Sequence, residues 1–288
     1  MPENFDVVVI GAGTAGYVGA IRAAQLKQKV AIVDRQWLGG VCLNVGCIPS
    51  KSLLRNAEVA HILRQRGKEF GFSFDNLRLD YGAAVKRSRQ NSDRLTKGVG
   101  FLMKKNGIVV YMGDARLRAK DTVEVTAADK QVTELKASNI IVATGATAAV
   151  PAAWKLDADK VITYLEAILQ ERLPKSVVII GSGAIGVEFA TIWNSYGVDV
   201  TIVEMLPRLV PLEDEEVSKE LEKEFKKRGI KCLVGTKVAS VEATKSGARV
   251  TVGSRLVVCV VVVPEPKAFS AFPCLRGENV CFCCLFAS

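Results

Sequence analysis

The chain has 288 residues, 49% of them hydrophobic and 24% charged. This composition is typical of a globular protein, and it excludes a disordered or collagen-like chain. The length suits two domains of ordinary size. The net charge is +9, but Lys and Arg are scattered beside Glu in helix-like segments such as residues 220–224 (ELEKE), which indicates a solvated surface and no nucleic-acid partner.

The N-terminal sequence does not predict a secretory signal. Residues 1–4 lack the basic stretch of a secretory signal, and the most apolar run, residues 256–263, is too short to span a bilayer. We therefore expect a cytoplasmic protein without a membrane partner.

A strand–turn–helix–strand pattern opens the chain. Residues 6–10 (DVVVI) predict a strand, which a glycine-rich turn follows at once. A helical pattern over residues 17–26 and a second strand over residues 30–33 come next, and that strand ends in Asp34. The glycines of the turn are Gly11, Gly13 and Gly16.

The same pattern returns later in the chain. A strand over residues 177–180, a helix over residues 187–196 and a strand over residues 198–203 end in Glu204. The offset is 170 residues for the first glycine (181 minus 11) and for the acid (204 minus 34). The glycines of this second turn are Gly181, Gly183 and Gly186.

Each copy has the context that a dinucleotide-binding turn requires. The first glycine permits a tight turn, the second lets the backbone approach a pyrophosphate, and the third lets the helix pack on the strand. The acid accepts hydrogen bonds from a ribose. Because a 2′-phosphate would be repelled by a carboxylate, Glu204 favours NAD over NADP, although Arg208 could weaken this preference. The pattern predicts an α/β fold with two Rossmann-like domains, in a chain that binds two dinucleotides or descends from one that did.

Two cysteines lie close together in residues 39–51 (GGVCLNVGCIPSK). On a regular helix Cys42 and Cys47 would point about 140° apart, so the nearby glycines and Pro49 predict an irregular turn if the sulfurs meet. A close pair in a reducing compartment is redox-active or metal-binding, unless both are buried unreactive thiols. Zinc would need further ligands, and only His61 is near, so we expect no metal.

With the first glycine-rich unit (GAGTAG) ahead of GGVCLNVGCIPSK, the chain resembles the pyridine nucleotide–disulfide oxidoreductases, and among them the dihydrolipoyl dehydrogenases. The resemblance extends over residues 6–252 and includes residues 140–146 (IIVATGA), similar to the family's crossing segment near the flavin. It implies FAD and NAD as cofactors. Electrons would pass from dihydrolipoamide through a Cys42–Cys47 disulfide and FAD to NAD. Cys42 would exchange with the substrate, and Cys47 would lie against the flavin.

The resemblance also assigns cofactor-binding positions. Lys51 matches a lysine near the flavin, and its alternative role is that of a surface lysine. Glu188 matches a position that contacts NAD, and its alternative role is a favourable charge near a helix N-terminus. The implied cofactor-binding residues are Gly11, Gly13, Gly16, Asp34, Gly40, Lys51, Gly113, Ala115, Thr144, Gly145, Gly181, Gly183, Gly186, Glu188, Glu204 and Val238.

The expected domains are an FAD-binding segment (residues 1–150), an NAD-binding segment (residues 151–263) and an atypical Cys-rich tail (residues 264–288). The tail matches nothing in the family, and a frameshift or chimeric junction over residues 253–263 would produce it. The family's interface domain, which forms its homodimer and supplies a His–Glu dyad, is missing, so we expect dimerisation and activity to be affected.

The resemblance implies a lipoyl domain of a 2-oxo acid dehydrogenase complex as the partner. Two alternatives remain open. One is a mercuric or other disulfide reductase of the same superfamily, since Cys283 and Cys284 are adjacent near the C-terminus. The other is a non-catalytic dinucleotide-binding fragment.

Overall fold

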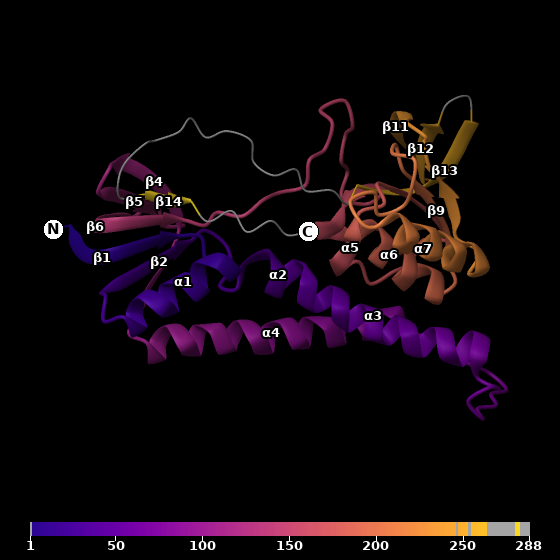
Figure 1. Ribbon diagram of the computed structural model, residues 1–288, viewed down its shortest axis with the longest axis horizontal. Coiled ribbons are helices and arrows are strands. Elements are labelled where there is room, and N and C mark those ends of the chain that lie inside the picture. Colours follow the sequence, from indigo (N-terminus) through magenta and orange to yellow (C-terminus); the bar gives the residue numbers. More distant parts are fainter. Residues whose placement is uncertain (1, 246, 253–254, 264–279, 283–288) are drawn as a thin grey trace. The chain divides into compact units, whose positions relative to one another are not determined.

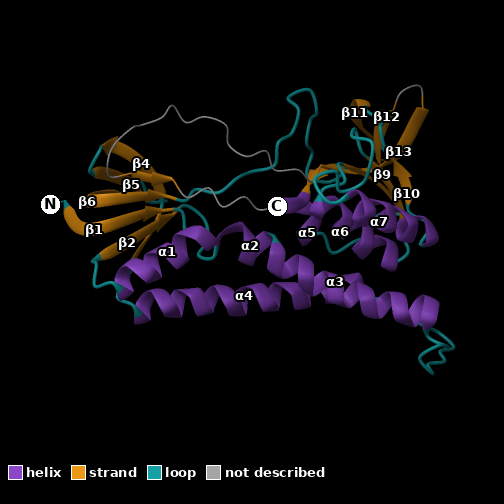
Figure 2. Cartoon of the chain, in the orientation of Figure 1, coloured by secondary structure: helices purple, strands orange, loops and turns teal. Residues whose placement is uncertain are grey.

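A computed structural model of the chain describes residues 2–245, 247–252, 255–263 and 280–282. The chain divides into two compact units, each built on its own sheet (Figures 1 and 2). The first takes its residues from Met1–Cys47, Gln90–Ala146 and Ala268–Ser288, and the second from Ile48–Arg89 and Thr147–Lys267. Mixed sheets with central parallel strands confirm the predicted α/β class.

The sheet of the first unit has the strand order β3-β2-β1-β6-β5-β4, with β14 beside β6. Strand β1 is parallel to β2 and β6, and Val8 faces Ala31 on one side and Ile140 on the other. All three residues are fully buried, because a central strand covered on both faces needs apolar side chains at every position. Helix α1 (Thr14–Gln25) follows β1 directly. The strands are β1 (Glu3–Ile10), β2 (Val30–Asp34), β3 (Val109–Met112), β4 (Asp114–Ala119), β5 (Thr122–Thr126), β6 (Val132–Val142) and β14 (Val280–Phe282).

The sheet of the second unit has the order β10-β9-β8-β13-β12-β11, with β7 beside β13. The apolar run noted in the sequence forms β13 (Arg255–Val263), which is parallel to β7 and β8 and antiparallel to β12. Its apolar character is that of an inner strand. In the described ranges no helix combines the length and hydropathy needed to cross a membrane. The other elements are β7 (Val161–Thr163), α5 (Tyr164–Leu169), β8 (Ser176–Ile180), α6 (Ala184–Ser195), β9 (Asp199–Val203), α7 (Glu215–Lys227), β10 (Lys231–Leu233), β11 (Val238–Thr244) and β12 (Gly247–Val252).

Three further helices connect β2 to β3. They are α2 (Gly40–Val45), α3 (Cys47–His61), which continues into a π-helical turn (Ile62–Arg66), and α4 (Tyr81–Lys105). The second unit includes Ile48–Arg89, which the sequence placed in the FAD-binding segment. The reason lies in long-range contacts with α6: Arg64 Nη1 donates to the Ser195 carbonyl (2.9 Å). Which segment binds which cofactor stays a prediction.

Tyr81 makes a buried hydrogen bond within the second unit. Trp193, which is fully buried, donates its Nε1–H to the Tyr81 hydroxyl (3.1 Å). Burial raises the pKa of Tyr81, so the hydroxyl stays neutral at ordinary pH. Tyr81 also packs edge-on against Tyr196, with ring centroids 5.0 Å apart. This cluster joins the start of α4 to α6.

We expect Y81F to lower the free energy of unfolding by about 1–3 kcal/mol, because the buried Trp193 N–H loses its acceptor. The measurement is urea unfolding followed by tryptophan fluorescence. The matched control is Y164F, since Tyr164 is also buried but makes no hydroxyl hydrogen bond to the residues that the structure describes. Equal losses in the two variants would contradict a specific contribution of the Trp193–Tyr81 bond.

Candidate functional site

The two glycine-rich turns have the same backbone bonds at positions 170 residues apart. Gly11 N donates to the Val33 carbonyl (2.7 Å), and Gly181 N donates to the Val203 carbonyl (2.8 Å). Each bond joins the turn to the end of the neighbouring strand, β2 or β9. The internal repeat predicted from spacing is therefore a repeat in structure.

The acids that end these strands also occupy equivalent places. Asp34 Oδ2 accepts from Ala12 N (2.7 Å), and Glu204 Oε2 accepts from Ser182 N (2.8 Å). Each donor is the middle residue of a Gly-X-Gly sequence. Each acid therefore stabilises the conformation of its glycine-rich turn. It also lies next to the turn, at the place where the ribose of a dinucleotide would lie if the pyrophosphate were bound at the turn. Sequence reasoning missed the two donors, although their position between the glycines was the available signal.

The glycines are required by close approach and by backbone conformation. Gly11 and Gly181 have φ values of +103° and +107°. A Cβ on Gly16 would lie 1.8 Å from the Gly11 carbonyl oxygen, and one on Gly186 would lie 2.2 Å from that of Gly181. The third glycine of each turn thus lets its helix touch the turn.

The helices that begin at these turns have free N-terminal ends. The N-cap residues are Gly13 for α1 and Gly183 for α6; neither supplies a side-chain cap, and neither first turn contains an acid. Backbone N–H groups at such an end bind anions, and the positive end of the helix dipole adds to this. Both turns therefore fit the pyrophosphate of a dinucleotide.

Segments distant in sequence meet around the first turn. A Cβ on Gly40 would lie 2.5 Å from Gly13 Cα, and Gly113 N donates to the Asp34 carbonyl (2.9 Å). The Cα of Thr144 lies 3.1 Å from the position of a Cβ on Gly11. The predicted positions that the first unit holds are Gly11, Gly13, Gly16, Asp34, Gly40, Gly113, Ala115, Thr144 and Gly145.

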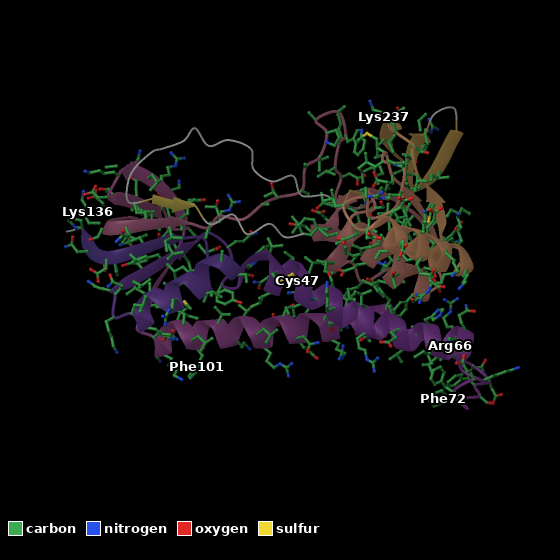
Figure 3. All side chains as sticks on the ribbon, in the orientation of Figure 1. Cys47, Arg66, Phe72, Phe101, Lys136 and Lys237 are labelled. Carbon is green, nitrogen blue, oxygen red and sulfur yellow. A yellow bond between two sulfur atoms is a disulfide. The ribbon has the colours of Figure 1, made fainter. Side chains whose placement is uncertain are left out.

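Cys42 and Cys47 form a disulfide, with their Cα atoms 4.7 Å apart. Helix α2 ends before Gly46, whose φ of −133° and ψ of −120° break the helix, and α3 starts at Cys47, labelled in Figure 3. The predicted irregular turn is confirmed. Its cause is Gly46 rather than Pro49, because Pro49 lies in the first turn of α3, where proline is tolerated. Cys47 is exposed and Cys42 is half-buried.

Asn44, between the two cysteines, holds α2 in place. Its Nδ2 donates to the carbonyls of Leu38 and Gly40 (2.9 Å each), and its Oδ1 accepts from the Thr96 hydroxyl (3.3 Å). Asn44 is not among the residues predicted from the sequence. A polar side chain inside a short apolar helix was the signal for it.

Lys51 and Glu188 form an ion pair in the second unit, with Nζ and Oε1 2.5 Å apart. Their side chains are 63% and 24% exposed, so the pair contributes at most about 1 kcal/mol to stability. Lys51 lies four residues after Cys47 on α3, one turn along the helix. The predicted positions in the second unit are Lys51, Gly181, Gly183, Gly186, Glu188, Glu204 and Val238.

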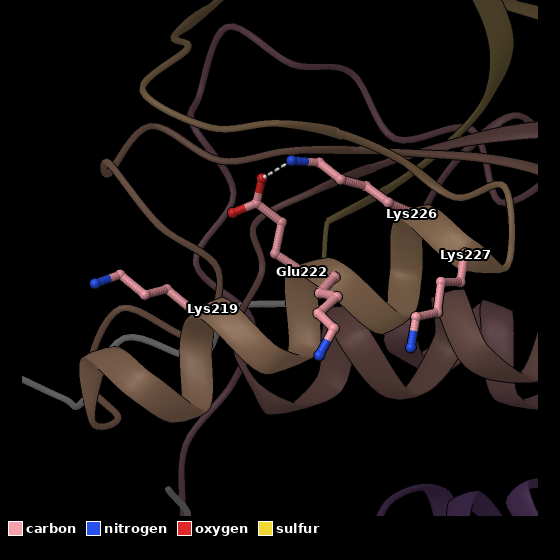
Figure 4. Close-up of a pocket in the computed structure, with 5 residues that line it drawn as sticks. Lys219, Glu222, Lys226 and Lys227 are labelled. Carbon is pink, nitrogen blue, oxygen red and sulfur yellow. Dashed lines mark ion pairs between the residues drawn. The ribbon is translucent and has the colours of Figure 1, made fainter.

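A shallow hollow on α7 is lined by charged side chains of that helix (Figure 4). Lys226 pairs with Glu222 there (2.7 Å). Each remaining lysine of the hollow also pairs with a glutamate of α7, so the hollow is the solvated surface that residues 220–224 predicted. Its lining residues are Lys219, Glu222, Lys223, Lys226 and Lys227.

Cys232 and His61 do not form a second reactive centre with other residues that the structure describes. Burial raises the pKa of Cys232 to about 11, and Glu222 adds to this, so the thiol is unreactive at neutral pH. Burial also lowers the pKa of His61, with Arg228 as the next cause. No group of three or more Cys, His, Asp or Glu residues is placed to hold a metal ion in the described ranges.

The chain is similar in sequence to proteins named dihydrolipoyl dehydrogenase. Dihydrolipoyl dehydrogenase of Mycobacterium leprae is 53% identical over 253 residues, which cover 86% of this chain and 54% of that protein. Dihydrolipoyl dehydrogenase of Corynebacterium glutamicum is 48% identical over 236 residues, covering 82% and 50%. The chain thus spans about half the length of the curated relatives it matches.

Solved structures share the fold. The structure of LpdA from Mycobacterium tuberculosis matches with a TM-score of 0.82 and 25% identity, covering 91% of this chain and 58% of that one. The flavoprotein disulfide reductase RclA from Escherichia coli matches in fold, with a TM-score of 0.80 and 22% identity, covering 93% and 57%. The family model of the pyridine nucleotide-disulphide oxidoreductases matches residues 5–268, beyond the point where the sequence resemblance was expected to end. The chain belongs to the pyridine nucleotide-disulphide oxidoreductase family.

Proposed function

We propose that the chain carries the electron-transfer centre of a dihydrolipoyl dehydrogenase, with FAD at the first glycine-rich turn and NAD at the second. One observation carries the proposal. The redox disulfide begins on α2, and the first residue of α2, Gly40, packs against Gly13 of the first turn. A dinucleotide at that turn would therefore lie beside the helix that bears Cys42. When bound, FAD supplies two-electron transfer between a dithiol and a nicotinamide.

The residues around each turn have separate tasks. The N-terminal ends of α1 and α6 would bind the pyrophosphates, and Asp34 and Glu204 would accept hydrogen bonds from ribose hydroxyls. Lys51 places a cation one helical turn after Cys47, where it would stabilise negative charge. The other proposed cofactor contacts are Gly11, Gly13, Gly16, Gly40, Gly113, Ala115, Thr144, Gly145, Gly181, Gly183, Gly186, Glu188 and Val238.

The disulfide would exchange with dihydrolipoamide in two steps. A substrate thiolate attacks Cys42 Sγ, forms a mixed disulfide and releases Cys47 as a thiolate. The second substrate thiolate then closes the lipoamide disulfide and releases Cys42, so that two electrons have moved to the cysteine pair. The assignment of Cys42 to the substrate and of Cys47 to the flavin rests on the resemblance.

The relatives named dihydrolipoyl dehydrogenase favour this activity over that of a mercuric reductase. The proposed partner is a lipoyl domain of a 2-oxo acid dehydrogenase complex, in the cytoplasm. The resemblance leads us to expect that the family's interface domain, with its His–Glu dyad and homodimer contacts, is missing here, and the chain spans about half the length of such relatives. The Cys283–Cys284 pair lies outside the described residues, as does nearly all of the predicted tail.

The test is the visible absorption spectrum of the purified chain, incubated with FAD and then freed of unbound FAD by gel filtration, before and after anaerobic addition of NADH. We expect a flavin band near ~450 nm that NADH bleaches, and a long-wavelength band from a thiolate beside the flavin. Turnover of lipoamide with NADH is then measured in the same preparation. A chain that is colourless once unbound FAD has been removed would be the non-catalytic fragment instead.

A further inference from the structure

In both units the chain after the acid returns to the glycine-rich turn. Gly39 N donates to the Ala12 carbonyl (2.8 Å), and Val210 N donates to the Ser182 carbonyl (3.1 Å). Both returning residues have left-handed backbones, with φ of +84° for Gly39 and +40° for Val210. A valine therefore occupies in the second unit the place that a glycine occupies in the first.

A β-branched residue is strained at positive φ, because its side chain crowds its own backbone. The surroundings hold Val210 there. Its carbonyl accepts from Glu213 N (2.9 Å) and from the Ser218 hydroxyl (3.4 Å), while Leu209 is fully buried. Strain of this kind is found where a local shape serves a ligand.

Arg208 ties the two sides of this bend together. Its Nη2 donates to the carbonyls of Pro211 (3.1 Å) and Glu213 (3.2 Å), so the bonds span Val210. Its Nε is buried and has no partner among the described residues, which makes the placement costly. The Arg208 Nη2 group therefore binds the backbone of residues 211–213 and not the Glu204 carboxylate.

The bend determines what the second turn presents to a ligand. Leu206 N donates to Glu204 Oε1 (2.8 Å), and Ser182 N and Oγ donate to Oε2 (2.8 Å each), so the carboxylate is fixed on both sides. Met205 and Leu206, next to Glu204, are 63% and 43% exposed. A fixed carboxylate beside exposed apolar side chains suits a ribose diol and an adenine ring.

We propose that Arg208 is a positioning residue: its bonds across Val210 hold that residue in its left-handed conformation, and this keeps residues 205–214, called the clamp below, against the second turn at the adenosine end of the proposed NAD site. This inference rests on the proposed function, because it takes the second turn as the NAD site. It adds a reason why Glu204 stays in position.

R208A is expected to weaken NADH binding by the full chain about tenfold, because Val210 relaxes from its strained conformation and the bond to Ser182 is lost. The measurement is a fluorescence titration with NADH. Without ligand, the amides of Val210 and Leu206 should exchange hydrogen faster in R208A than in the wild type. The matched control is R172A, an exposed arginine of the same unit.

The double variant R208A/V210G separates positioning from direct contact. Glycine adopts a φ near +40° without strain, so the second substitution should restore NADH binding to within about threefold of wild type and slow the exchange at residue 206. Failure of this rescue, or an R208A variant that binds NADH like the wild type, would overturn the clamp alone. A wild-type chain that does not bind NADH would instead overturn the proposed function and leave the clamp without its ligand.

Discussion

Replacing Cys47 with serine is expected to abolish turnover between NADH and lipoamide, with a loss of about 10³-fold or more, the scale for losing a nucleophile. The cysteine pair can no longer alternate between disulfide and dithiol, so it cannot pass the two electrons of NADH on to the lipoamide disulfide. Steady-state NADH oxidation measures turnover. Thiol titration before and after reduction gives a second readout, because reduction should release two more thiols in the wild type than in C47S.

The matched control is C232S. Cys232 is a free, half-buried thiol with a pKa of about 11, and at pH 8 only about one molecule in 10³ would carry its thiolate. C232S should therefore keep both turnover and the two releasable thiols. Comparison of C42S with C47S assigns the roles, since only the variant that keeps the flavin-side sulfur should show the long-wavelength band. Wild-type turnover in C47S would place the disulfide outside the reaction.

Most of the fold could be predicted because its signals are local. The β-branched runs became β1, β2, β8 and β9, and the glycine spacing set both turns. The grouping of α3 and the start of α4 with the second unit could not be predicted. It depends on Arg64 reaching Ser195 and on Trp193 reaching Tyr81, contacts between residues more than 100 positions apart.

The candidate site, like the fold, could be predicted from the sequence where its signals are local. The irregular turn between the cysteines was predicted from the nearby glycines and Pro49; the glycine part of this prediction is confirmed at Gly46, whereas Pro49 lies in the first turn of α3 and does not cause the turn. Val210 gave no signal, because valine favours extended backbone and its left-handed conformation runs against its propensity. Such conflicts between local preference and structure are expected at functional sites.

The assignment of one cofactor to each turn is tested by the paired variants G16A and G186A. In each, the new Cβ would lie within 2.2 Å of a backbone carbonyl oxygen, so the helix must move away from its turn. We expect G16A to weaken FAD binding about 100-fold or more while NADH binding stays near that of the wild type, and G186A to do the reverse. FAD absorbance and NADH fluorescence are read in the same samples.

The control is G19A, because Gly19 lies inside α1 and a Cβ there meets nothing within 4 Å. That variant should keep both cofactors and gain up to about 1 kcal/mol in the free energy of unfolding, since alanine favours a helix over glycine. Loss of NADH binding in G16A with FAD retained would reverse the assignment of the turns. Loss of both ligands in G16A, with an unfolding transition shifted well below that of G19A, would show that the glycine serves the stability of the chain and not one cofactor.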